Sequence, residues 1–119
     1  MEEEPRGSIL YRLAENLHQA LPTIAHRIKE IHILKDTLEY VYVRLLIRKN
    51  PLYIESPWDA ILLNIARTKQ IHVDDLPKYL QHIITLFEDL LKGKITESEV
   101  HELIDFLETI LATFLPPQS

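Results

Sequence analysis

The chain has 119 residues, of which 46% are hydrophobic and 26% charged, with no cysteine and a formal net charge of −5 at pH 7. This composition is typical of one globular domain that is long enough to bury a core, and not of a disordered segment. It excludes a disulfide framework, a thiol nucleophile and a thiolate metal site. No uninterrupted apolar run reaches the ~18 residues of a membrane span.

We expect a single helical domain over residues 1–119, with an acidic tail at 1–7 and a short tail at 116–119. The acidic start lacks the apolar region of a signal peptide, so a cytoplasmic location is expected. Only two glycines are present, which leaves few positions suited to tight hairpins or phosphate-binding loops. The scarcity of the thermolabile residue types Cys, Met, Asn and Gln favours a thermophilic origin.

The first predicted helix follows Ser8, a residue type that caps helix N-termini, and ends before Pro22. Its apolar residues recur at three- and four-residue spacing: Ile9, Leu10, Leu13, Leu17 and Leu21. The second helix starts at about Pro22 and continues to about Lys49. It has two interleaved apolar stripes, formed by Ile24, Ile31, Leu38 and Leu45 and by Ile28, Leu34 and Val41.

A second interpretation of this region is a small β-hairpin near residues 40–54. The segment Tyr40–Ile47 is rich in β-branched and aromatic residues, and Leu52–Ile54 follows after a turn-like break. We favour the helix because the seven-residue apolar repeat continues without interruption as far as Leu45.

Three more helices are predicted. One begins at Ser56-Pro57-Trp58-Asp59 and fades near Thr68, and the next begins at Asp74 or Asp75 and ends at Gly93, a C-terminal cap. The last follows a capping box, Thr96-x-x-Glu99, and stops at Pro116. The predicted fold is therefore all-α, a single antiparallel bundle of about five helices.

Metal chemistry is weakly indicated. Glu15-x-x-His18 matches half of a di-iron carboxylate set, which needs a second such motif and further glutamates. We expect no metal, no cofactor and no catalytic residue. Glu15 and His18 would be the starting points of the alternative, a small metal-dependent helical enzyme.

The segments Ile61–Ala66 and Val73–Leu80 resemble the two helices of a helix-turn-helix, so a DNA-associated regulator is another alternative. A recognition helix presents polar side chains to base edges. This one offers Lys78, Gln81 and His82 among many apolar residues.

Charge is distributed unevenly along the chain. Residues 1–50 carry eight Lys and Arg against seven Asp and Glu, a balance of +1, whereas residues 51–119 carry five against eleven, a balance of −6. The cations of the second helix are the candidate contacts to nucleic-acid phosphates: Arg27, Lys29, Arg44, Arg48 and Lys49. If helices two and four finish at the same end of the bundle, Arg44, Arg48 and Lys49 lie near Lys92 and Lys94.

Small, cysteine-free chains of five helices with basic helix faces resemble the small helical subunits of CRISPR effector complexes. That resemblance implies a role in antiviral defence and subunits that pack side by side along a guide-bound filament and contact nucleic-acid backbone without cutting it. We therefore expect a non-catalytic helical subunit or adaptor of a larger assembly. Its expected partners are other protein subunits or further copies of itself, with RNA or DNA backbone inside the assembly and no membrane.

Overall fold

The computed structural model describes residues 6–21, 27–47 and 57–114. These ranges contain five α-helices: α1 (Arg6–Ala20), α2 (Ile28–Ile47), α3 (Pro57–Lys69), α4 (Leu76–Leu91) and α5 (Glu97–Phe114). A single 3₁₀ turn, η1 (Val73–Asp75), leads into α4. The described part of the chain contains no strand, which confirms the all-α class.

The boundaries of α1 and α2 differ in part from those expected. Helix α2 begins at Ile28, and residues 22–26, which include the start expected at about Pro22, lie outside the described residues. Helix α1 begins at Arg6, so Ser8 lies inside the helix and is not its N-cap. Residues 40–47 belong to α2, which confirms the helix there. The first strand of the alternative hairpin is therefore wrong. Residues 48–54 of that hairpin, like the terminal residues 1–5 and 116–119 of the predicted tails, lie outside the described residues.

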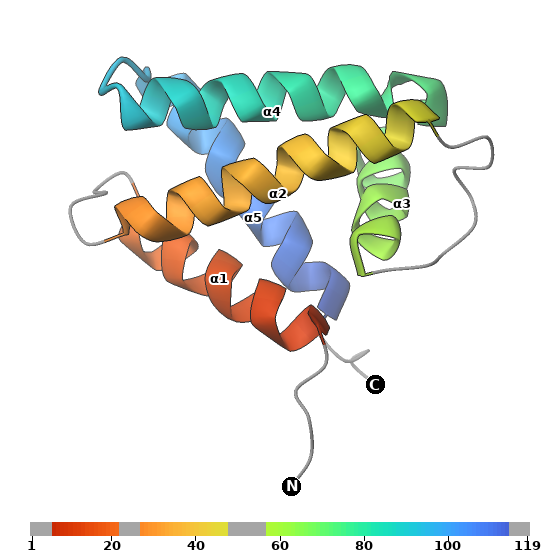
Figure 1. The fold of residues 1–119 in the computed structure, drawn as a ribbon, viewed down its shortest axis with the longest axis horizontal. Helices are drawn as coiled ribbons and strands as arrows, with labels where there is room; N and C mark the ends of the chain where they lie inside the picture. The colour runs from red at the N-terminus through yellow and green to blue at the C-terminus, as the bar shows by residue number, and fades with distance from the viewer. Residues whose placement is uncertain (1–5, 22–26, 48–56, 115–119) are drawn as a thin grey trace, which may run out of the picture.

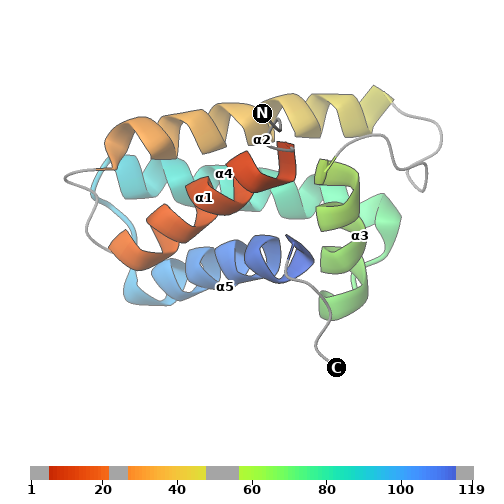
Figure 2. The same cartoon turned by 90° about the horizontal axis from the view of Figure 1, so that it is seen from below.

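The helices pack mainly as two pairs, α1 with α5 and α2 with α4. Helix α2 lies along one side of the molecule and α5 along the opposite side, with α1 and α4 between them (Figure 2). Helix α3 stands across the direction of α2 and α4 in both ribbon views (Figures 1 and 2). The antiparallel arrangement of the whole bundle stays a prediction.

The core consists mainly of leucine and isoleucine from the predicted stripes. In α2 the buried residues are Ile31, Leu34, Leu38, Val41 and Leu45. Ile28, which was expected to continue this stripe, is instead 45% exposed. Phe87 of α4 and Phe106 of α5 are fully buried and meet edge to face with ring centroids 6.4 Å apart, a favoured aromatic geometry.

The link from α4 to α5 follows the predicted caps. Gly93 has φ of 71°, its N–H donates to Leu90, and the Lys94 N–H donates to Asp89, which together form a Schellman motif. The Thr96 N–H donates to the Glu99 carboxylate and the Glu99 N–H to the Thr96 hydroxyl, a complete capping box. These two predictions are confirmed.

Helix α3 ends on a residue poorly suited to its conformation. Gln70 has φ of 56°, and the following Ile71 N–H donates to Ala66 at 3.0 Å. This is the left-handed C-terminal position that glycine occupies at Gly93, and the left-handed region costs a residue with a Cβ atom about 1 kcal/mol or more.

We therefore expect Gln70→Gly to stabilise the protein by about 1 kcal/mol, which raises the melting midpoint by about 3–5 °C. The matched variant Gly93→Ala should destabilise by a similar amount, because an added Cβ at Gly93 meets nothing within 4 Å and only the backbone conformation is penalised. Thermal unfolding followed by circular dichroism measures both. A Gln70→Gly midpoint at or below that of the unmodified protein would contradict this account.

Candidate interaction surface

The structure places three of the five predicted phosphate-contacting cations, since Arg48 and Lys49 lie outside the described residues. Arg27 Nη1 donates to Glu30 Oε1 at 2.8 Å, one turn along the chain. Lys29 is exposed on α2. Of these three, Lys29 is the cation most open to a ligand.

Arg44 is engaged inside the fold. Its Nη2 donates to Asp59 Oδ1 at 2.9 Å, and the Asp59 side chain is fully buried in the first turn of α3. The Arg44 side chain is only 23% exposed. The ion pair therefore joins α2 to α3, and the full exposure that the phosphate-contact hypothesis required of Arg44 is not found.

The ends of α2 and α4 meet differently from the expectation. Lys35 Nζ lies 3.7 Å from Glu88 Oε2, and a shallow cavity of about 430 Å³ is lined by Ile28, His32, Lys35, Glu88, Leu91 and Lys92. The start of α2 thus lies beside the end of α4 (Figure 1). The expected meeting of Arg44 with Lys92 is wrong, because α3 stands across α2 and α4 and does not run back along α2, so α4 runs in the opposite direction to α2 (Figure 1).

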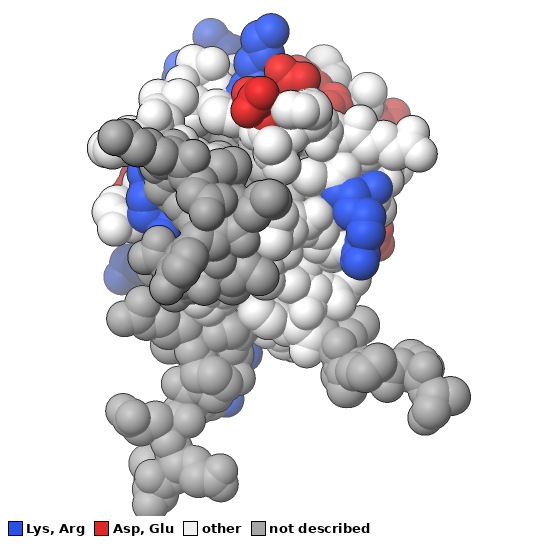
Figure 3. Space-filling view, turned by 90° about the vertical axis from the view of Figure 1, so that its right-hand side faces the viewer, with Lys and Arg blue, Asp and Glu red and all other residues white. Residues whose placement is uncertain are grey.

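Lysine and arginine do not form a continuous patch on the side of the molecule that carries α3. Over the described residues of this face the cations are scattered, and acidic side chains lie beside one group of them (Figure 3). Scattered cations hold fewer phosphates at once than a basic stripe, which is the usual electrostatic footprint of a nucleic-acid-binding protein.

Three of the described histidines, His18, His72 and His82, each lie beside a single carboxylate. His18 Nε2 lies 3.0 Å from Glu108 Oε2, which links α1 to α5, and His82 Nε2 lies 2.8 Å from Glu102 Oε1, which links α4 to α5. Among the residues that the structure describes, no group of three or more His, Asp or Glu side chains is arranged to hold a metal ion. The pair Glu15 and His18 is therefore not extended into a ligand set there.

Helix α3 stands across α4, and η1 lies between them in the chain (Figure 1). The chemistry of the second helix is less suited to DNA. Asp74 and Asp75 are exposed at its start, the end of a recognition helix that enters the DNA major groove, and His82 on its exposed face pairs with Glu102. Two carboxylates at that end would repel the DNA backbone.

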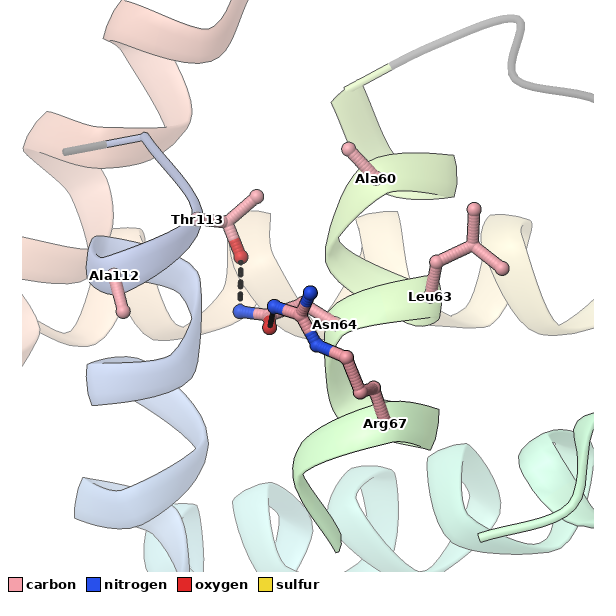
Figure 4. A pocket seen from close by; sticks show the side chains of 6 residues that line it. All are labelled: Ala60, Leu63, Asn64, Arg67, Ala112 and Thr113. Carbon is pink, nitrogen blue, oxygen red and sulfur yellow. Dashed lines mark hydrogen bonds between the residues drawn. The ribbon is translucent and has the colours of Figure 1, made fainter. Parts of the chain in front are cut away.

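A second cavity, of about 500 Å³, lies between α3 and α5 and is lined by Ala60, Leu63, Asn64, Arg67, Ala112 and Thr113 (Figure 4). Asn64 Nδ2 donates to Thr113 Oγ1 at 3.0 Å, and Arg67 Nη2 donates to Asn64 Oδ1 at 2.9 Å. These polar groups hydrogen-bond to one another, so the cluster links α3 to α5.

Tyr79 of α4 packs against Phe106 beneath the acidic side of α5. Burial, and then the negative charges of Asp105 and Glu102, raise the pKa of the Tyr79 phenol far above its ordinary value of 10. The unfolded chain therefore releases this proton first as the pH rises through 10, and the free energy of unfolding falls above that pH.

We expect Tyr79→Phe to remove this part of the alkaline loss of stability while leaving stability near pH 7 almost unchanged. Urea unfolding at pH 8 and at pH 11 measures it: the midpoint should fall less between the two pH values in Tyr79→Phe than in the unmodified protein. Tyr11→Phe, the same change at a phenol on α1, is the control and should behave as the unmodified protein. Equal losses in all three would contradict the assignment.

The most unusual surface feature belongs to α2. Over residues 11–21, 27–47 and 57–114, whose side-chain burial the structure describes, six large hydrophobic side chains are exposed, and all of them are on this helix: Ile28, Ile33, Tyr40, Val43, Leu46 and Ile47. At 100° per residue, four of them fall in one line along the side opposite the core. We call this line, formed by Ile33, Tyr40, Val43 and Ile47, the outer stripe.

The outer stripe is well placed for contact with another molecule. Its members are between 52% and 74% exposed. In Figure 2, α2 lies at the edge of the molecule, and no other described helix covers its outer side. Contiguous exposed apolar side chains of this kind mark interaction sites on soluble proteins.

Sequence reasoning did not find the outer stripe, although a signal was present. Tyr40–Ile47 has a strand-like composition because α2 is apolar on two faces, and only one of these faces is needed for the core. The excess apolar residues were the indication of a second contact surface.

Comparisons of the chain with models of protein families, with curated proteins and with solved structures found no match. Over the described residues, no helix combines the length and apolar character that crossing a membrane requires.

Proposed function

We propose that this protein is a non-catalytic helical subunit or adaptor that acts in the cytoplasm by binding another protein through the outer stripe of α2. One observation carries the proposal: among residues 11–21, 27–47 and 57–114, whose side-chain burial the structure describes, every large hydrophobic side chain that is exposed is on α2. Fixed helices present this surface already formed, so little ordering is needed on binding.

The experiment that tests this function compares Tyr40→Glu with Gln81→Glu. Tyr40 is central in the outer stripe, whereas Gln81 is exposed on α4, and both changes add one negative charge. Each purified variant is immobilised, exposed to a lysate of the source cells, and the bound proteins are quantified. We expect Tyr40→Glu to lose partners that the unmodified protein and Gln81→Glu retain, with unchanged circular dichroism. Identical sets of bound proteins would contradict the proposal.

A second candidate function is contact with nucleic-acid backbone inside an assembly, as the resemblance to CRISPR small subunits implies. It is favoured by one observation: exposed Lys29 and exposed Lys92 lie at the same end of the α2–α4 pair. Binding of RNA or DNA by the intact assembly, measured at two salt concentrations, tests it. Lys29→Glu with Lys92→Glu should weaken this binding, and Lys78→Glu, an exposed cation at the start of α4, is the control.

A further inference from the structure

We propose that the protein bound by the outer stripe is a second copy of this chain. The α2 helices of the two copies pack against each other in antiparallel directions. This inference rests on the proposed function, because it names the partner of the same surface. It follows from the spacing of the stripe and from the placement of its two charged neighbours.

The spacing is that of a helix-pairing seam. Residues 29, 33, 36, 40, 43 and 47 follow one another at steps of four and three, the repeat with which two helices pack along one another. Four of the six positions carry the large apolar side chains of the outer stripe. The other two positions carry Lys29 and Asp36, both exposed.

The two charged residues select the direction. In a parallel pair, equivalent residues face each other, so Lys29 would meet Lys29 and Asp36 would meet Asp36. Like charges brought together in an interface oppose association. In an antiparallel pair these contacts are replaced by contacts between different residues, and the dipoles of the two helices also run in opposite directions.

The register follows from helix length. The seam allows antiparallel registers that differ from one another by seven residues. In the register nearest to full overlap of the 20-residue α2, the two helices cross the two-fold axis at residue 38. This register places Ile33 opposite Val43 of the second copy, and Asp36 opposite Tyr40 of the second copy, where the phenol can donate to the carboxylate. The two-fold axis produces each of these contacts twice, as an isologous dimer requires.

The dimer formed in this way is a modest one. The contact extends over about 30 Å, the length of a 20-residue helix. The charges of Lys29 and Asp36 cancel within the seam, although the whole chain carries a net charge of −5. One helix pair lies near the small end of specific interfaces. We therefore expect a dissociation constant in roughly the micromolar range, with little dependence on salt because most of the seam is apolar.

Sedimentation velocity over a range of protein concentrations, at low salt and at high salt, tests the association. We expect a monomer–dimer equilibrium for the unmodified chain, at least a tenfold weaker one for Tyr40→Glu, and an unchanged one for the control Gln81→Glu. Circular dichroism establishes that each variant is folded. A chain that is monomeric at every concentration overturns the proposal, and so does a dimer that Tyr40→Glu leaves intact.

Disulfide trapping tests the direction without background, because the chain has no cysteine of its own. Ile33→Cys and Val43→Cys are made as separate single variants and oxidised alone or as a mixture. The antiparallel register predicts efficient cross-linking only in the mixture, between one chain of each variant. If each variant cross-links with itself and no cross-link forms between the two variants in the mixture, the pair is parallel and the proposal is overturned.

The two proposals fail in different ways. If the chain is monomeric but Tyr40→Glu still removes a protein captured from the lysate, self-association is wrong and the adaptor function stands. If the chain is monomeric and Tyr40→Glu changes no captured protein, the function of the outer stripe is wrong as well.

Discussion

Replacing Arg44 with methionine should lower the free energy of unfolding by about 3–5 kcal/mol, because it removes a hydrogen-bonded cation from beside a carboxylate that is fully buried. Asp59 is fully buried, and Arg44 Nη2 lies 2.9 Å from its Oδ1. The loss should appear in urea unfolding as a lower midpoint with an unchanged slope. The matched control is Lys29→Met, which removes an exposed cation from the same helix and should change stability by less than about 0.5 kcal/mol.

The double variant Arg44→Met with Asp59→Leu separates the cost of removing one partner of the pair from the net contribution of the pair to stability. Removing both charges leaves no buried carboxylate without its arginine, so we expect it to recover much of the stability lost in the single variant. A single variant as stable as Lys29→Met would show that the pair contributes little. Arg44→Glu is accordingly unsuited to testing phosphate contacts, because it would place a second carboxylate beside Asp59 and unfolding would hide any effect on binding.

Phe106→Ala should destabilise the protein by about 3–5 kcal/mol, since it opens a cavity in a closely packed core. The Phe106 ring is completely buried and is packed edge to face with Phe87 and tilted against Tyr79. Its removal therefore loosens the contact between α4 and α5. The measurement is again the free energy of unfolding from urea titration.

Leu46→Ala is the control for Phe106→Ala. Leu46 is 58% exposed on α2, so its truncation leaves no cavity and should change stability by less than about 0.5 kcal/mol. Equal losses for the two variants would contradict the assignment of Phe106 to the core and of Leu46 to the surface.

Local features were predictable from the chain alone because their causes are local. The link from Gly93 through the capping box at Thr96 depends on residues within a few positions of one another, and its hydrogen bonds are those expected. The core stripe of α2 was predictable for a similar reason, since the spacing of Ile31, Leu38 and Leu45 places them on one face of any helix. Gln70 was missed because nothing in its residue type signals a left-handed backbone.

The candidate site was only partly predictable, because it depends on contacts between distant segments. Arg44 was chosen as a surface cation, yet the arrival of α3 places the buried carboxylate of Asp59 beside it. Because α3 stands across the α2–α4 pair, the end of α4 lies beside the start of α2, and not beside Arg44 as expected. Charge patterns along one helix do not contain this information.

By itself, the sequence determined that the protein is all-α, where most helices begin and end, and which stripes form the core, because caps and periodic spacing act within one helix. It also determined that α2 has more apolar residues than one buried face can use. Only the tertiary structure decided which of these residues the other helices cover and which remain exposed as the outer stripe. Burial is a property of packing between helices, and a helix with two apolar faces does not specify which face its neighbours will cover.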